Sequence, residues 1–233
     1  QGPAGANGVV DTLLIDSLVQ SYITGSGGGC DFQYPDGYHG DPITETLYSN
    51  GVSTPYTVPS NKILYITNIY AEGEVIISGA GSIINGSLST TIVNQGVTEE
   101  GLKSLNNPVV LGAGDQIQSS AEAVINGFLI NSSNSAVTPI SFGGISGSLN
   151  SFSVPSGKRL FILNIHKSYL YIDNIKIQEQ AGEYYVLGQP LVINSSQIVS
   201  ITSNCCFNGY LVDENYFAGC GGGSSSATSS LDS

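Results

Sequence analysis

The pattern of hydrophobic and polar positions predicts a β-strand at residues 63–69. Residues 63–69 are Ile-Leu-Tyr-Ile-Thr-Asn-Ile, which is largely apolar at both odd and even positions. Successive side chains of a strand point to opposite faces of a sheet. Because a strand that is apolar on both faces is normally covered on both, we expect a facing sheet on one side and a neighbouring module or subunit on the other.

This strand belongs to an internal repeat. Residues 56–69 (Tyr-Thr-Val-Pro-Ser-Asn-Lys-Ile-Leu-Tyr-Ile-Thr-Asn-Ile) match residues 152–165 (Phe-Ser-Val-Pro-Ser-Gly-Lys-Arg-Leu-Phe-Ile-Leu-Asn-Ile). Farther along, Pro-Val-Val at 108–110 matches Pro-Leu-Val at 190–192, and Asn-Gly-Phe at 126–128 matches Asn-Gly-Tyr at 208–210. The distance between matched residues is shorter for the two later matches than for the first match, and it is the same for both. The first copy therefore carries an extra stretch before residue 106. The repeat predicts a duplicated module.

Each copy is predicted to consist of antiparallel strands joined by turns. Val-Pro-Ser indicates a turn before the alternating strand, and the Gly and Asn positions beyond it are typical of hairpins. We therefore predict an all-β protein with two tandem β-sandwich modules of jelly-roll type, at residues 44–133 and 139–213. Residues 214–233 are predicted to form a Gly/Ser-rich tail, disordered apart from Cys220.

A collagen-like pattern occupies residues 1–8. Gly2, Gly5 and Gly8 stand at every third position, as the crowded axis of a triple helix requires. The pattern predicts a stalk end and a homotrimer. Since Gln1 lies within the pattern, we expect the natural chain to extend further in the amino-terminal direction.

Residues 9–24 follow the collagen-like segment and favour a short helix. Ile15, Leu18 and Tyr22 occupy heptad positions a, d and a, which predicts a three-stranded bundle that aligns the chains. A helix of this length is marginal alone, so association would stabilise it. The alternative is a single helix packed on the head.

Residues 25–43 are predicted to be a hinge and an aromatic lead-in to the first module. The hinge is rich in Gly, and the lead-in contains a Pro-Asp-Gly turn signal. Asp31, Asp36 and Asp41 are oxygen ligands that calcium would accept, and calcium is the one cofactor that the sequence leaves open. The alternative is that all three are solvated turn residues.

The charge balance excludes some partners. The net charge is -12 with only six Lys and Arg, so the chain lacks the cation clusters that nucleic acids and anionic membrane surfaces require. The sequence contains no apolar run of about 18 residues, so membrane insertion is not expected.

The four cysteines are Cys30, Cys205, Cys206 and Cys220, and none forms a Cys-x-x-Cys pair. An even number in a chain that reads as exported favours disulfides. We expect Cys30 and Cys220 each to pair with one of the adjacent residues Cys205 and Cys206, with either assignment open. The alternative is buried thiols.

No pattern for catalysis is present. The two histidines, His39 and His166, do not form a metal-binding motif, and the Gly-Gly-Ile-Ser-Gly sequence at 143–147 lacks the setting of a nucleophile elbow. We therefore expect a non-enzymatic protein. Binding remains open, because the chain has 13 tyrosines. Its candidate ligand-binding residues are Tyr169, Tyr171, Tyr184 and Tyr185; cross-strand aromatic pairing is the alternative.

Collagen-like Gly repeats, a trimerising segment and a β head in this order resemble the collagen-stalked fibre proteins of bacterial surfaces and phage tails. The order is also similar to that of C1q- and TNF-like proteins, without their aromatic signature. The resemblance implies a trimeric fibre head for attachment or appendage assembly, outside the cell, at a cell surface or on a virion. A carbohydrate-binding (lectin-like) module that recognises cell-surface glycans, and a virion or filament subunit, are the alternative functions.

Overall fold

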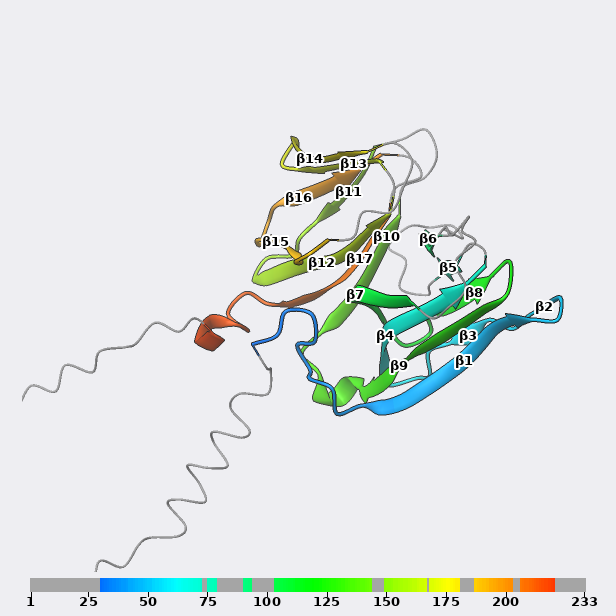
Figure 1. The fold of residues 1–233 in the computed structure, drawn as a ribbon. Coiled ribbons are helices and arrows are strands. Elements are labelled where there is room, and N and C mark those ends of the chain that lie inside the picture. The colour runs from blue at the N-terminus through cyan, green and yellow to red at the C-terminus, as the bar shows by residue number, and fades with distance from the viewer. Residues whose placement is uncertain are drawn as a thin grey trace, which may run out of the picture.

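The computed structural model describes residues 30–72, 75–78, 90–93, 103–143, 149–166, 168–180, 187–202 and 206–220. These residues form four antiparallel sheets, which confirms the all-β prediction (Figure 1). The collagen-like segment at 1–8 and the predicted helix at 9–24 lie outside the described residues. No helix in the described ranges has the length and apolar character needed to cross a membrane.

The first copy of the repeat forms two sheets. Sheet A has, in spatial order, β2 (Val52–Ser53), β1 (Asp41–Ser49), β9 (Ala123–Asn131), β4 (Lys62–Ala71) and β7 (Lys103–Leu111). Sheet B has β3 (Tyr56–Thr57), β8 (Gln116–Ser119), β5 (Val75–Ser78) and β6 (Thr90–Val93). Both sheets contribute side chains to one buried core, in which Leu64, Ile66 and Ile117 are fully enclosed.

The second copy repeats this plan. Sheet C has β10 (Thr138–Gly143), β17 (Cys206–Asp213), β12 (Lys158–His166) and β15 (Leu191–Ile193). Sheet D has β11 (Asn150–Ser153), β16 (Ile198–Ile201), β13 (Ser168–Ile172) and β14 (Ile175–Gln180). Their core contains Leu160, Ile162 and Phe207. Two short 3₁₀ helices, η1 (Ser132–Asn134) and η2 (Ala218–Cys220), follow β9 and β17.

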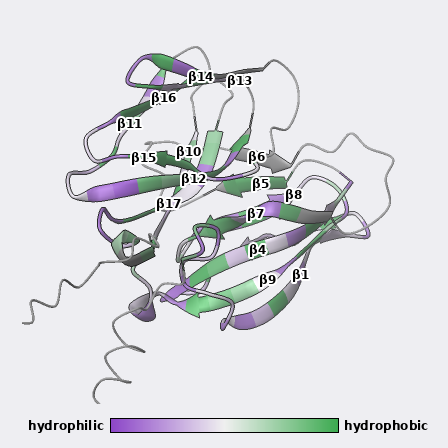
Figure 2. Cartoon of the chain, turned by 60° about the vertical axis from the view of Figure 1, so that its left-hand side comes forward, coloured by the Kyte–Doolittle hydropathy of each residue, from purple (hydrophilic) through white to green (hydrophobic). Residues whose placement is uncertain are grey.

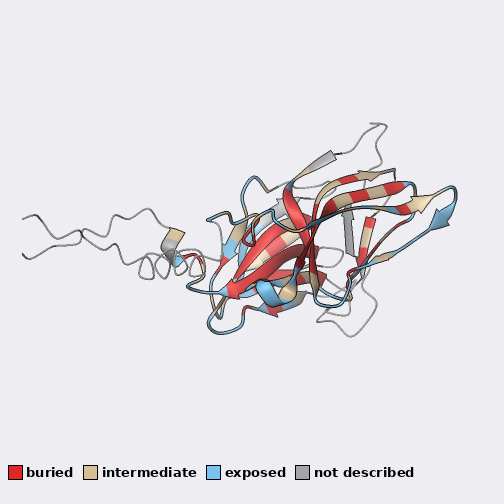
Figure 3. Ribbon diagram, turned by 90° about the horizontal axis from the view of Figure 1, so that it is seen from below, coloured by how far each residue is buried: buried red, intermediate tan, exposed pale blue. Residues whose placement is uncertain are grey.

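A third hydrophobic cluster joins the two modules. On β4, Leu64 and Ile66 face the first module's own core, whereas Ile63 and Tyr65 face this cluster. The strands of sheets A and C are apolar and buried where the modules meet (Figures 2 and 3). The prediction that the strand at residues 63–69 is covered on both faces is confirmed, and the other module covers its second face.

The prediction of two tandem β-sandwich modules of jelly-roll type is only partly confirmed. The described residues build four separate sheets, and sheets A and C pack on each other as well as on sheets B and D. The result is a four-sheet, blade-like arrangement rather than two separate sandwiches. The reason is the apolar outer face of β4 and β12, which each module must bury.

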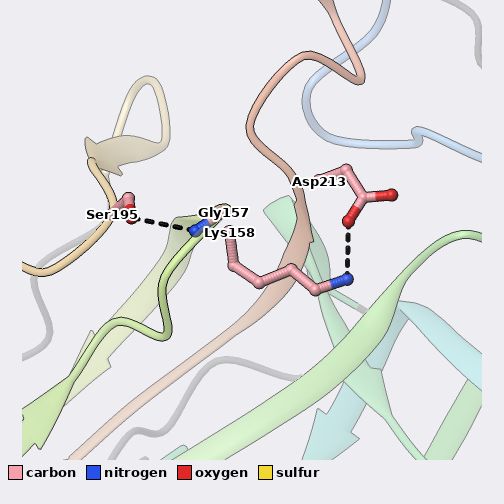
Figure 4. Close-up of polar contacts among 4 residues, drawn as sticks. All are labelled: Gly157, Lys158, Ser195 and Asp213. Atoms are coloured by element: carbon pink, nitrogen blue, oxygen red, sulfur yellow. Dashed lines mark hydrogen bonds and ion pairs between the residues drawn. The ribbon is translucent and has the colours of Figure 1, made fainter.

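The Val-Pro-Ser segments form the predicted turns. In the second copy Gly157 adopts φ 74°, and its N–H donates to Ser195 Oγ at 3.0 Å (Figure 4). Lys158 then starts β12 and pairs with Asp213 at 2.7 Å, at the end of β17 (Figure 4). In the first copy Asn61 takes the corresponding left-handed conformation, with φ 62°. A residue that tolerates positive φ is therefore required at this place in both copies.

The two Asn-Gly pairs of the repeat lie within strands rather than at hairpin turns. Gly127 lies in the middle of β9, and Gly209 lies in the middle of β17. Opposite each glycine the partner strand carries a β-bulge, in β4 and β12. A Cβ at Gly209 would overlap the carbonyl oxygen of Phe161 and lie 3.0 Å from Ile162 Cα. Glycine is used here because a neighbouring backbone approaches closely.

Both ends of the described head are held together. Cys30 and Cys220 form a disulfide, with their Cα atoms 5.2 Å apart, so the expectation that each pairs with Cys205 or Cys206 was wrong. Cys206 is buried in β17, and Cys205 lies outside the described residues. The lead-in crosses the third cluster to reach the segment after β17, which brings the two distant cysteines together.

Two predicted boundaries also change. Residues 25–43 were expected to be hinge and lead-in, but β1 already begins at Asp41, and Tyr34 is buried in the third cluster. The predicted tail at 214–233 starts with an ordered aromatic segment, in which Phe217 is buried in the same cluster. Residues 221–233 lie outside the described part of the chain.

Candidate functional site

The contact between the modules is built around an edge strand. β7 is the last strand of sheet A, and it contacts β10, β12 and β17 of sheet C. The Val110 N–H donates to Asn208 Oδ1 at 2.9 Å, and Asn208 Nδ2 donates back to the Val110 carbonyl at 2.8 Å. A single amide side chain thus satisfies both backbone groups on the open edge of β7, which would otherwise be buried without partners.

Neighbouring amides extend this contact. Asn164 Nδ2 donates to the Pro108 carbonyl at 2.8 Å, and Asn107 Nδ2 donates to the Leu187 carbonyl at 2.6 Å. Asn208 is only 2% exposed, and its amide also donates to Ser141 Oγ at 3.0 Å. The two bonds between Asn208 and Val110 are buried and the neighbouring bonds are part-buried, so an unpaired group at this contact would be costly.

The corresponding face of the first module carries an open pocket of about 570 Å³. Six of its lining residues are the repeat counterparts of residues at the module contact: Pro42, Asn68, Leu105, Asn126, Gly127 and Phe128. Tyr34, Tyr38, Gly40 and Thr67 complete the lining. The pocket is therefore the first module's version of the surface that receives β7 in the second.

The amide side chains of the pocket have partners within the first module. Asn126 Nδ2 donates to the Ile43 carbonyl at 3.1 Å and to Thr44 Oγ1 at 3.0 Å. Asn208 Nδ2 makes the same two contacts in the second copy, to the carbonyl of Ile140 and the hydroxyl of Ser141. The two copies differ at the amide oxygen: Asn126 Oδ1 accepts from Asn68 at 3.2 Å instead of from a docked strand.

Two tyrosines from the lead-in form one wall of the pocket. The Tyr34 and Tyr38 ring centres are 4.3 Å apart, and Tyr38 is 65% exposed. Burial, with smaller contributions from Tyr38 and Asp31, raises the pKa of Tyr34 from 10.0 to about 12. Burial also raises the pKa of Tyr38. Both hydroxyls are therefore neutral at physiological pH, and the pocket is lined by uncharged groups.

The three aspartates of the lead-in do not gather round a cation. Asp36 accepts from the Tyr65 hydroxyl and from Ser135 Oγ, each at 2.7 Å. Asp31 accepts from the backbone N–H of Gln33, and Asp41 pairs with Lys62. Within the described ranges no three His, Cys, Asp or Glu side chains are grouped as metal ligands. Each aspartate has a separate structural partner, so the structure does not bring together the calcium ligands that the sequence left open.

The predicted tyrosine group is only partly visible. Tyr169 and Tyr171 flank the buried Leu170 on β13, so both lie on the outer face of sheet D, and both are half-buried. Lys176 Nζ lies 5.3 Å from the centre of the Tyr169 ring, a cation–π contact. Tyr184 and Tyr185 lie outside the described residues. Ligand binding by this group stays a prediction.

Sequence reasoning missed the most structured polar site, which is the module contact. Asn126 and Asn208 were recognised as parts of the repeated Asn-Gly motif, but no hydrogen-bonding role was predicted for them. The usable signal was their position between strongly apolar residues on both sides. A buried strand rarely contains a polar side chain unless that side chain has a hydrogen-bonding role.

No protein-family model and no curated protein matches the chain. Among solved structures, the regulatory subunit of a cAMP-independent protein kinase A from Trypanosoma cruzi, bound to guanosine, aligns at 10% identity over 94% of this chain and 88% of its own, with a TM-score of 0.23. The regulatory domain of Toxoplasma gondii PKA with cAMP aligns at 12% identity over 76% of this chain and 80% of its own, with a TM-score of 0.20. Scores this low carry no argument about fold or function.

Proposed function

We propose that the chain is the non-enzymatic head of a trimeric extracellular fibre, displayed on a collagen-like stalk for attachment or appendage assembly. The observation that carries the proposal is the Gly period at residues 2, 5 and 8, followed at once by a heptad pattern. Glycine at every third position suits three chains wound together. Three heads on one stalk would multiply weak contacts through avidity.

The arrangement of the head supports this proposal. The disulfide between Cys30 and Cys220 closes the head just where the stalk would enter. The lead-in is held further, because the Tyr210 hydroxyl donates to the Phe32 carbonyl at 2.6 Å and the Tyr216 hydroxyl donates to the Pro35 carbonyl at 3.2 Å. A force applied through the stalk would therefore act on a region that the disulfide and these two hydrogen bonds hold together, rather than on an open end of the sheets.

The mass of the full chain in native solution tests the proposal. We expect three chains per particle. Replacing both Ile15 and Leu18 with Asp should shift the particles to lower mass, because charges would enter the heptad seam. Ser17→Asp is the control at a polar position and should leave three chains. Single chains for the parent protein at micromolar concentration would exclude the trimeric head.

Carbohydrate binding is a second candidate function, favoured by the placement of Tyr169 and Tyr171 together on the outer face of sheet D. Aromatic rings on a sheet face offer flat surfaces for sugar rings. We expect glycan-array binding that is lost in Tyr169→Ala and kept in Tyr48→Ala, a control on β1. Absence of binding to all glycans, with and without calcium, would exclude this function.

A further inference from the structure

Each module has a docking strand and a receiving surface, but among the described residues a contact is seen for one docking strand and one receiving surface. The docking strand of the first module is β7, and the receiving surface of the second module contains Asn164 and Asn208. The repeat supplies the other pair. β15 is the counterpart of β7, and the pocket with Asn68 and Asn126 is the counterpart of the receiving surface.

The equivalence of the two docking strands extends to their register. β7 pairs with β4 through Val110 opposite Tyr65, and β15 pairs with β12 through Val192 opposite Phe161. Both are the outermost strands of their sheets. Their environments differ sharply: Val110 is fully buried, whereas Val192 is 51% exposed. An apolar edge strand left open in this way is prone to pair with another surface.

We infer that β15 of one copy of this chain docks into the first-module pocket of a second copy, repeating the internal contact of β7 with sheet C. In this contact Asn126 binds the N–H and carbonyl of Val192 in the neighbouring copy, as Asn208 binds those of Val110. Asn68 donates to the carbonyl of the neighbour's Pro190, as Asn164 donates to that of Pro108.

The pocket fits this occupant with limited rearrangement. The Asn126 amide already makes the two contacts that orient Asn208 in the second module. Docking requires Asn68 to exchange its present bonds to Thr67 and Asn126 for the incoming carbonyl. The second module has Leu163 where the first has Thr67, so its Asn164 has no such competing hydroxyl. The tyrosine wall, Tyr34 and Tyr38, adds apolar surface for Val192.

The contact is heterologous, because it joins two different surfaces. Contacts of this kind either close into rings or extend into filaments. The inference rests on the proposed function for the number of chains: three copies, joined by three such contacts, close a ring around the stalk. The pairing itself follows from the repeat and does not depend on the stalk.

Photo-cross-linking of the full chain tests the contact. A photoreactive amino acid replaces Val192, and the control places it at Val52, which is equally apolar and 60% exposed but lies on β2. We expect covalent dimers and trimers from position 192 only, with the cross-linked peptide containing Asn68 or Asn126. Because the contact residues are uncharged, the yield should be the same at low and high salt.

A second variant tests whether the cross-link depends on the Asn126 amide. Adding Asn126→Ala should lower the yield from position 192 at least about tenfold, because both proposed hydrogen bonds to the Val192 backbone are lost. Asn131→Ala, an exposed residue at the end of β9, should leave the yield unchanged. Equal yields for the two variants would overturn the role of Asn126.

Native mass of the same samples separates the two proposals. Three chains with the cross-link support both proposals. Three chains without the cross-link overturn the docking contact and leave the trimeric head standing. Cross-linked particles of another size support the contact and overturn the trimer, and single chains without cross-links overturn both.

Discussion

Asn208 and Asn126 occupy equivalent positions of the repeat, but it is Asn208 that binds the edge strand β7 at the contact between the modules. Asn208→Ala removes the only described partners of the Val110 N–H and carbonyl on the edge of β7. Asn126→Ala removes bonds of a half-buried amide within its own module. We therefore expect the two substitutions to differ in cost and in location.

The size of the effect of Asn208→Ala follows from the Val110 N–H and carbonyl, which the substitution leaves without partners. A buried donor or acceptor left without a partner costs about 1–3 kcal/mol, so losing both partners of Val110 costs about 3 kcal/mol after some access of water to the strand edge. That loss corresponds to exchange of the Val110 amide hydrogen on the order of 100-fold faster, if exchange proceeds by local opening. Asn126→Ala should change this exchange by less than about threefold.

Hydrogen–deuterium exchange followed by mass spectrometry measures the effect in the peptide that spans residues 108–112. Both variants are compared with the parent chain at one protein concentration and one pH. The reasoning fails if Asn208→Ala exchanges like the parent in this peptide. It also fails if Asn126→Ala accelerates exchange there to the same extent.

Three further outcomes follow from the fold. Gly209→Ala should lower the free energy of unfolding by about 1–3 kcal/mol in urea denaturation, because its Cβ meets the backbone of β12, whereas Gly188→Ala, which meets nothing within 4 Å, should be neutral. Replacing Cys30 and Cys220 by Ser should cost up to about 5 kcal/mol, because the disulfide closes a loop with a sequence separation of 190; a parent chain that melts at the same temperature with and without reductant would contradict this. Tyr34 ionises more readily unfolded, near 10.0, than folded, near 12, so its contribution to stability is present below pH 10 and is lost as pH rises towards 12. A Tyr34→Phe variant that loses as much stability as the parent chain between pH 10 and pH 12, measured by urea denaturation followed by circular dichroism, would contradict this.

The repeat allowed much of the fold to be predicted, because a strand apolar on both faces has few alternatives. Ile63 and Tyr65 had to be covered, and the second module covers them. The four-sheet arrangement could not be predicted, since an apolar face indicates that something packs on it without indicating what. The sequence left a neighbouring subunit equally open.

The candidate site was harder to predict, because its residues act through the backbone of a distant strand. Asn208 and Val110 are far apart in the sequence, and neither belongs to a known chemical motif. Local patterns favoured a turn at Asn-Gly, and the close approach of β12 to Gly209 overrode that preference. The aromatic pair at 216–217 was not predicted to be ordered, because it lies beside a Gly/Ser-rich stretch. Its position just before Cys220 indicated that it belongs to the region held by the disulfide.

The structure of the assembled full chain, determined by electron cryomicroscopy or crystallography, tests the central claim most directly. We expect three chains in a ring, with the Asn126 amide of each within hydrogen-bonding distance of the Val192 backbone of the next. A particle in which Val192 faces solvent, or in which the Asn126 pocket is filled by anything other than a neighbouring β15, would contradict the account.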